Sequence, residues 1–246
     1  MKKPAKRAAT APALRQLRKD VLWANVEIAR RGLAKFTFGN ASAIDRASGL
    51  VTIKPSGVPY EELTIASLVV TDLSGKVVEG SLKPSSDLAT HLVLYRAFRH
   101  IGAVVHTHSH YATVWAQARR EIPCLGTTHA DYFHGAVPVT AALSNAELDT
   151  AYEANTGEAI VRRFAGLDPM HVPAVLVAGH ASFCWGSSAA AAVETATVLE
   201  EVARMAHDTV ALNPAVQPIE QTLMDTHFYR KHGPRAYYGQ SPKRRP

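Results

Sequence analysis

Three histidines stand at alternating positions directly after a short run of β-branched residues: His106, His108 and His110 in the segment VVHTHSH. Alternate residues of a strand point to one face and lie roughly 6–7 Å apart. The imidazoles of His106 and His108 can therefore share one divalent ion, with Zn–N bonds of about 2.0–2.1 Å. An H-x-H pair alone is a weak signal, because two hydrogen-bonded core histidines would give the same pattern. His110 falls where a helix is expected to begin, so we expect it not to be a ligand.

A second segment favours a metal site over two core histidines. His180 follows the apolar run AVLVAG, so it too is expected at the end of a buried strand. Two strands that each deliver imidazoles at one end would build a three-histidine site with an open coordination position. We therefore predict His106, His108 and His180 as ligands of a divalent ion. His91 is as well explained by an exposed position as by one near this site.

Three short segments, FGNAS, KPSG and KPSSD, carry groups that bind anions. Glycines allow the backbone to approach an anion closely, and amide, hydroxyl and ammonium groups donate hydrogen bonds to it. Each segment alone is an ordinary turn or helix start, but the three together favour a phosphate site. Its candidate residues are Asn40, Lys54, Ser56, Gly57, Ser85 and Ser86. Asp87, which follows the serines, is either a first-turn helix acid or a carboxylate near the metal, as ligand or base.

The elements that must position these residues alternate between hairpins and helices. Hairpin turns are predicted at Ser48-Gly49 and Ser74-Gly75. Helical spacing predicts helices over 12–34, 85–100, 110–119, 145–165 and 188–212. Strands are expected over 102–108 and 137–142, segment 174–186 is expected to be a strand running into a turn, and the tail 227–240 is expected to be irregular. This pattern predicts one α/β domain over residues 1–246, with residues 1–14 as a flexible basic lead-in.

The composition excludes several classes of protein. The 246 residues are 47% hydrophobic and 20% charged, as in a globular protein with a sizeable core. No apolar run approaches the roughly 18–20 residues of a membrane span, so we expect no membrane association. Cys124 and Cys184 are too few for a disulfide framework, which indicates the cytoplasm. The net charge of +6 comes mainly from the two ends. We therefore expect no nucleic-acid partner, and a small phosphate ester explains the positive charge as well.

Taken in order, several segments resemble the class II aldolase/adducin family, and within it the L-ribulose-5-phosphate 4-epimerase branch. They are GNASAID, IKPSG, VVEGSLKPSSDLATHLVLYRAF, IGAVVHTHSHYATVWAQA, GTTHADYFHG, VLVAGHASFCWG and FYRKHGPRAYYGQ, from about residue 15 to Gln240. The resemblance implies a three-layer α/β/α sandwich with a central, mainly antiparallel sheet. It also implies a homotetramer with active sites at subunit interfaces. The metal it implies is usually zinc, with Mn²⁺ or Co²⁺ as other possibilities, held by His106, His108 and His180.

The resemblance also implies roles for other residues. Asp87 is associated with the metal in the epimerase branch, whereas related aldolases carry a glutamate there and use it as the base. Asp131 and Tyr238 match the acid/base pair, with Tyr238 expected from a neighbouring subunit. Thr127 and His227 match further active-site positions. The aspartate at position 87 and the motifs THADYF and AYYGQ favour an epimerase over a fuculose- or rhamnulose-phosphate aldolase, which stays the alternative.

The implied reaction is inversion at C4 of L-ribulose 5-phosphate to give D-xylulose 5-phosphate. Because the C4 hydrogen is not α to the C2 carbonyl, the expected route is retro-aldol cleavage of C3–C4 and re-addition, with the metal as Lewis acid. The residues leave open whether this serves L-arabinose, ascorbate or another pentose route. One departure is Ala181, where the family usually has glycine after the histidine. Glycine is needed there only at positive φ, and we expect a conformation that tolerates alanine.

Overall fold

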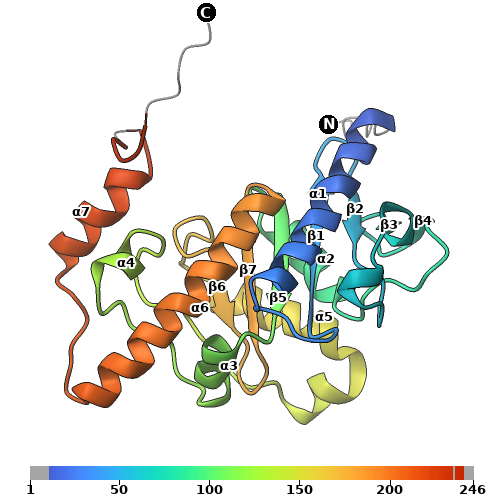
Figure 1. Ribbon diagram of the computed structural model, residues 1–246. Coiled ribbons are helices and arrows are strands. Elements are labelled where there is room, and N and C mark those ends of the chain that lie inside the picture. The colour runs from blue at the N-terminus through green and yellow to red at the C-terminus, as the bar shows by residue number, and fades with distance from the viewer. Residues whose placement is uncertain (1–10, 235, 241–246) are drawn as a thin grey trace, which may run out of the picture.

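The computed structural model describes residues 11–234 and 236–240. A seven-stranded sheet in the order β4-β3-β2-β1-β5-β7-β6 lies between two layers of helices (Figure 1). Each neighbouring pair of strands is antiparallel. The predicted fold class, a three-layer α/β/α sandwich with a mainly antiparallel sheet, is therefore confirmed.

The bounds of the elements are as follows. The strands are β1 Gly39–Asp45, β2 Leu50–Ile53, β3 Val69–Thr71, β4 Val77–Glu79, β5 Ala103–Thr107, β6 Ala174–Leu176 and β7 Ser182–Gly186. The helices are α1 Ala11–Arg30, α2 Leu88–Ala97, α3 His110–Gln117, α4 Thr127–Ala130, α5 Asn145–Arg163, α6 Ala189–Leu212 and α7 Gln221–Lys231. Two single 3₁₀ turns, Tyr60–Glu62 and Ile65–Ser67, connect β2 to β3. None of the helices within the described ranges has both the length and the apolar composition of a bilayer span.

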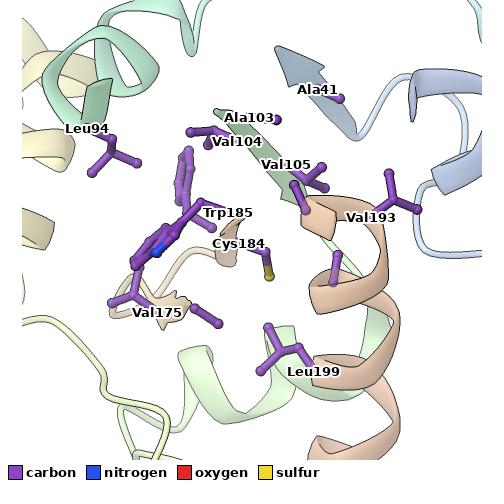
Figure 2. Close-up of a cluster of buried hydrophobic side chains, with 14 of the residues drawn as sticks. Ala41, Leu94, Ala103, Val104, Val105, Val175, Cys184, Trp185, Val193 and Leu199 are labelled. Carbon is purple, nitrogen blue, oxygen red and sulfur yellow. The ribbon is translucent and has the colours of Figure 1, made fainter. Parts of the chain in front are cut away.

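One face of the sheet packs against α6, which lies beside α1 (Figure 1). Val193 and Leu199 of α6 join Val105 of β5 and Cys184 of β7 in a core that is almost completely buried (Figure 2). Burial of an aliphatic side chain of this size stabilises a fold by about 1.5–3 kcal/mol. This layer fixes the orientation of β5. Because side chains alternate along a strand, Val104 and His106, on either side of Val105, point to the opposite face of the sheet.

The opposite face of the sheet carries polar groups as well as apolar ones. Ser42 of β1 shares its hydroxyl between His91 Nδ1 and Tyr95 Oη of α2, each at 2.7 Å. The ring of Phe98, at the end of α2, lies 5.2 Å from that of Trp185 in β7. Residues paired directly across a sheet share a face, so His106, opposite both Asn40 and Phe183, points to this α2 side.

The structure differs from the sequence prediction in three segments. Residues 174–186 form two strands, β6 and β7, because the chain reverses between them, with the Val177 N–H bonded to Ala181 O at 2.8 Å. Residues 137–142 form no regular strand but only single bridges to neighbouring segments. The tail, expected to be irregular, contains α7. Residues 11–14 of the predicted lead-in belong to α1, and the rest of that lead-in lies outside the described residues.

Candidate metal centre

His106 is the most deeply buried of the candidate ligands. Its Nδ1 lies 2.9 Å from the carbonyl oxygen of Ser182 on the neighbouring strand β7. A carbonyl only accepts, so Nδ1 donates this hydrogen bond, and in the neutral tautomer that donates it Nε2 keeps a lone pair for a metal. A metal-binding histidine commonly has its other ring nitrogen fixed in this way, which sets both tautomer and orientation. The strand pairing that forms the sheet therefore also prepares one ligand atom.

The other two candidate histidines converge on His106. His108 follows β5, with its backbone N–H bonded to Phe38 O at 3.3 Å, and the reversal between β6 and β7 carries His180 to the same place. One potential ligand atom from each of the three side chains lies within 4.8 Å of the others. His108 is exposed and His180 partly buried, so the site opens towards solvent beside them. Three imidazoles and an open side suit a divalent ion that also binds a ligand.

Burial keeps two of these imidazoles uncharged. It lowers the pKa of His180 to about 4, with the nearby His106 and His108 acting in the same direction. Burial, and then His106, also lowers the pKa of His108. Only a neutral imidazole has a lone pair to offer a metal. Near neutral pH, the environment therefore favours the metal-binding form of both side chains.

Asp87 places a negative charge beside the histidines. It precedes the first residue of α2, and its Oδ2 lies 4.0 Å from Nε2 of His106. Asn40 Nδ2 donates a hydrogen bond of 2.7 Å to the same oxygen. Burial alone would raise the pKa of Asp87, but the neighbouring His106 and His91, with the hydrogen bond from Asn40, leave it lowered. The anionic carboxylate adds a hard oxygen to the donor set, which fits a divalent cation.

Asn40 reaches this position because of the glycine before it. A Cβ on Gly39 would lie 2.6 Å from His106 O, so only glycine allows β1 to approach β5 so closely here. The Oδ1 atom of Asn40 is buried and has no hydrogen-bond partner among the described residues. An unpaired buried acceptor is costly. Its position beside Asp87 marks a place where a bound molecule would complete the contacts.

The other two segments that are predicted to bind phosphate, KPSG and KPSSD, lie side by side. Ser56 N donates to Lys83 O at 2.9 Å, and Ser85 N donates to Lys54 O at 3.0 Å. The side chain of Lys54 is almost fully buried, and its ammonium lies 5.1 Å from the centre of the Tyr60 ring. Within the described chain the ammonium makes one hydrogen bond, to Pro55 O at 3.3 Å, and burial lowers its pKa. An ammonium has three donors, so two are available to an anion. Gly57 and Ser86 lie exposed at the same loops.

Asp131 belongs to a separate group built on α7. Arg230 donates two hydrogen bonds to its carboxylate, at 3.0 and 2.8 Å, and His227 Nδ1 lies 3.1 Å from Oδ1. Lys231 Nζ lies 3.4 Å from Oδ2. Burial opposes ionisation of Asp131, but Arg230, His227 and Lys231 more than offset it and lower its pKa. The carboxylate is thus ionised and tightly held.

Tyr238 joins this group through the same two cations. The Arg230 guanidinium lies 4.9 Å and the Lys231 ammonium 4.6 Å from the centre of its ring, which is 60% exposed. Thr127 stands one helical turn before Asp131, whose N–H bonds Thr127 O at 2.9 Å. The predicted residues Thr127, Asp131, His227 and Tyr238 therefore lie together in one chain.

The Asp131 group lies at the far end of β7 from the histidines. Tyr132 lines a cavity of about 250 Å³ together with Gly186, the last residue of β7. His180 instead precedes Ser182, the first residue of that strand. Four steps along a strand cover about 13 Å. Between described residues, no hydrogen bond, ion pair or ring contact connects the two groups.

Sequence patterns did not reveal Ser182, Arg230 and Glu200. Ser182 and Glu200 act through contacts across the fold: Glu200 of α6 accepts hydrogen bonds from two N–H groups in the first turn of α3, those of Tyr111 at 2.9 Å and Ala112 at 3.0 Å. A signal for Arg230 was present, since it stands three residues after His227 and so shares its helix face.

Ala181 replaces the usual family glycine without strain. Among the described non-glycine residues, Phe36 and Arg119 have positive φ and Ala181 does not. The positive φ in this turn falls on Gly179, at 72°. The expectation of an alanine-tolerant conformation is confirmed.

The antiparallel sandwich with three convergent histidines fits a metal-dependent enzyme, and similar proteins identify its family. Residues 19–207 match the family described as Class II Aldolase and Adducin N-terminal domain, and the chain belongs to this family. It is 54% identical over 227 residues to "L-ribulose-5-phosphate 4-epimerase UlaF" of Salmonella paratyphi B (strain ATCC BAA-1250 / SPB7), covering 92% of this chain and 100% of the relative.

Two solved structures are also similar. One is an L-fuculose 1-phosphate aldolase with a TM-score of 0.73 and 28% identity, covering 89% of this chain and 97% of that one. The other is the L-fuculose 1-phosphate aldolase from Glaciozyma antarctica PI12, with a TM-score of 0.74 and 16% identity, covering 96% and 88%. At that identity the second likeness supports the fold alone.

Proposed function

We propose that this chain is an L-ribulose-5-phosphate 4-epimerase that interconverts L-ribulose 5-phosphate and D-xylulose 5-phosphate by retro-aldol cleavage and re-addition. The observation that carries the proposal is the meeting of His106, His108 and His180 beside the carboxylate of Asp87. The identity of the sugar comes from the epimerase relative, which the chain matches over that relative's full length.

Each part of the site then has a role. Zinc is the proposed metal, with Mn²⁺ or Co²⁺ able to replace it, and His106, His108 and His180 with Asp87 would hold it. When bound, the ion supplies a Lewis acid that stabilises negative charge on the sugar oxygens while C3–C4 breaks. The phosphate of the substrate would be bound by six residues of the three loops, Asn40, Lys54, Ser56, Gly57, Ser85 and Ser86. By holding the phosphate, these groups keep the aldehyde fragment in the site while it rotates.

Asp131 and Tyr238 are the proposed acid/base pair. Inversion needs one group to exchange a proton with the C4 hydroxyl on each face of the sugar. The structure supports Asp131 as an ionised carboxylate fixed by Arg230 and His227. Tyr238 shares the cation Arg230 with it, so the two proton-exchanging groups are held near each other. Thr127 and His227 are proposed as substrate-binding residues of the same active site.

We further propose a homotetramer in which the Asp131 group of one subunit completes the metal centre of another. The separation of the two groups along β7 supports this arrangement. Exposed apolar residues on α6 and α7, such as Met205, Leu212 and Leu223, supply surface for subunit contacts. We place the enzyme, as one domain over the whole chain, in the cytoplasm, since both cysteines are free and buried thiols.

The proposal is tested by following D-xylulose 5-phosphate formation from L-ribulose 5-phosphate. The purified protein is stripped with a chelator and then reloaded with Zn²⁺, Mn²⁺ or Co²⁺. We expect activity to be lost on stripping and regained on reloading, and Asp131→Asn and Tyr238→Phe to lower kcat by at least about 100-fold, as loss of a general acid or base does. Absence of conversion by the reloaded enzyme would contradict the proposal.

A class II sugar-phosphate aldolase of the fuculose- or rhamnulose-phosphate type is the alternative. The 28% identity to a solved L-fuculose 1-phosphate aldolase favours it. The same preparation is therefore assayed with L-fuculose 1-phosphate and L-rhamnulose 1-phosphate. Release of dihydroxyacetone phosphate faster than epimerisation would establish the aldolase; the Asp87 carboxylate in place of glutamate leads us to expect the opposite.

A further inference from the structure

A tyrosine from α5, outside all the segments that point to the metal centre, lies against that centre. The ring of Tyr152 is 6.2 Å from that of His180 and almost perpendicular to it, at 88°. Its side chain is partly buried. A tyrosine titrates near 10 in free peptides, so near neutral pH this phenol carries its proton and can donate a hydrogen bond.

Close packing of α5 on α2 brings Tyr152 to this place. A Cβ on Gly157 would lie 2.7 Å from the Cβ of Val93, so glycine at this position lets the two helices touch. Thr90 of α2 donates a hydrogen bond of 2.5 Å to the carbonyl oxygen of Glu153. Since α2 begins immediately after Asp87, these contacts tie the backbone around Tyr152 to the element that carries the carboxylate.

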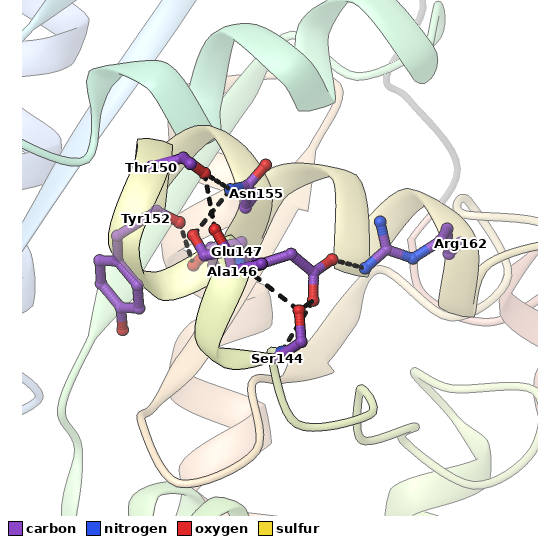
Figure 3. A network of polar contacts seen from close by, with 8 residues as sticks. Ser144, Ala146, Glu147, Thr150, Tyr152, Asn155 and Arg162 are labelled. Atoms are coloured by element: carbon purple, nitrogen blue, oxygen red, sulfur yellow. Dashed lines mark hydrogen bonds and ion pairs between the residues drawn. The ribbon is translucent and has the colours of Figure 1, made fainter.

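A break in α5 directs the ring. Ala151 has φ −143° and ψ 66°, which are not helical, and Tyr152 follows at once. Asn155 spans the break by donating to Glu147 O at 2.7 Å and to Thr150 Oγ1 at 3.1 Å. Figure 3 shows that the ring of Tyr152 points away from this network and that no marked hydrogen bond reaches its hydroxyl.

We propose that Tyr152 is a substrate-binding residue whose phenol O–H donates a hydrogen bond to an oxygen of the sugar phosphate held beside His180. The kink at Ala151 and its Asn155 brace serve to aim this hydroxyl. The identity of the sugar rests on the proposed epimerase function, but the role of Tyr152 as a donor does not require that the bound sugar be epimerised.

The experiment compares Tyr152→Phe with Tyr111→Phe. Tyr111 is a matched control because it is also partly buried and its ring lies against another histidine, His110, at 5.0 Å. Zinc content, kcat and KM for L-ribulose 5-phosphate, and the calorimetric Kd for D-xylulose 5-phosphate are measured on zinc-loaded enzyme. We expect Tyr152→Phe to keep one zinc per chain and to lose about tenfold in kcat/KM, the effect of one neutral hydrogen bond. Tyr111→Phe should match wild type.

The outcomes separate this inference from the proposed function. Wild-type rates for Tyr152→Phe, an equal loss in Tyr111→Phe, or loss of zinc from Tyr152→Phe would overturn the donor role. If wild type binds the sugar phosphate without converting it, the epimerase assignment fails while Tyr152 is still judged by Kd. In that case about tenfold weaker binding supports the donor role, and unchanged binding overturns it. Asn155→Ala, which releases the kink, should weaken binding in the same direction.

Discussion

The guanidinium of Arg230 makes two hydrogen bonds to the carboxylate of Asp131, at 3.0 and 2.8 Å. Arg230 also lies over the ring of Tyr238, so both members of the proposed acid/base pair are fixed by one side chain of α7. A subunit that supplies Tyr238 to a neighbour must therefore supply Asp131 as well. The sequence led us to expect only Tyr238 from the neighbour, and the contacts of Arg230 lead us to propose that the whole group comes from it.

Subunit complementation follows from this arrangement. His108→Asn removes a candidate ligand and Asp131→Asn removes a candidate base, so each variant alone should have less than about 1% of wild-type activity. When the two variants are unfolded and refolded together, mixed oligomers should contain some sites with both groups intact. We expect activity to return to a substantial fraction of wild type. Refolded wild type gives the reference, and no recovery in verified mixed oligomers would place both groups in one subunit.

Lys54 should contribute to phosphate binding and not to stability. Its ammonium is buried with one hydrogen bond, so replacement by methionine removes a desolvated charge, which is often neutral or stabilising. We expect Lys54→Met to raise KM for the sugar phosphate about 100-fold without lowering Tm. The exposed Lys76→Met is the control. A fall in Tm of several degrees with unchanged KM would show instead a structural role for Lys54.

Glu200 should stabilise the first turn of α3 and, through it, the position of His108. Its carboxylate accepts the N–H groups of Tyr111 and Ala112, two of the unpaired donors at a helix start. Glu200→Gln has one acceptor oxygen in place of two and no charge to complement the helix dipole. We expect unfolding to become easier by about 1–2 kcal/mol and zinc binding to weaken, because His108 stands two residues before α3. Equilibrium unfolding and metal competition measure the two effects. Glu201→Gln, whose carboxylate pairs with Arg204 at an exposed site, should change stability by less than about 0.5 kcal/mol.

Protonation of His129 should lower the free energy of unfolding as the pH falls below about 6.5. Burial lowers its pKa to about 4, from an ordinary value of 6.5, and its Nε2 donates to Gly135 O at 2.8 Å. Between these two pKa values the unfolded chain binds a proton that the folded chain does not. The free energy of unfolding therefore falls as pH drops from about 6.5 towards 4, by about 1.4 kcal/mol per pH unit. His129→Gln keeps a donor and cannot titrate, so its urea midpoint should fall less between pH 6.5 and 5. Equal falls in the two proteins would contradict this.

Local patterns in the sequence predicted the secondary structure where one pattern dominates. The helix predicted over 12–34 forms over Ala11–Arg30, and the hairpin turns at Gly49 and Gly75 were predicted correctly; Gly32, Gly49 and Gly75 all have positive φ. Segment 174–186 was predicted as one strand running into a turn, and the second strand after that turn, β7, was not predicted. The backbone hydrogen bond from Val177 to Ala181 that reverses it is formed in the folded chain and has no side-chain signature.

The candidate site was predictable where residues act in motifs and not where they act through packing. Alternation and strand ends pointed to His106, His108 and His180. Tyr152 was missed because its approach depends on the contact of α5 with α2 and on a kink, which have no local signal beyond Gly157. The grouping of Asp131 with α7 was missed because it joins segments about 100 residues apart in the sequence.

The central claim is that three imidazoles from two segments hold one catalytic ion. The most direct measurement is anomalous X-ray diffraction, recorded on both sides of the zinc absorption edge, from crystals of the zinc-loaded enzyme. The account predicts one zinc peak per chain, with His106, His108 and His180 nitrogens about 2.0–2.1 Å away. A peak elsewhere, or none between these rings in a protein that epimerises its substrate, would contradict it.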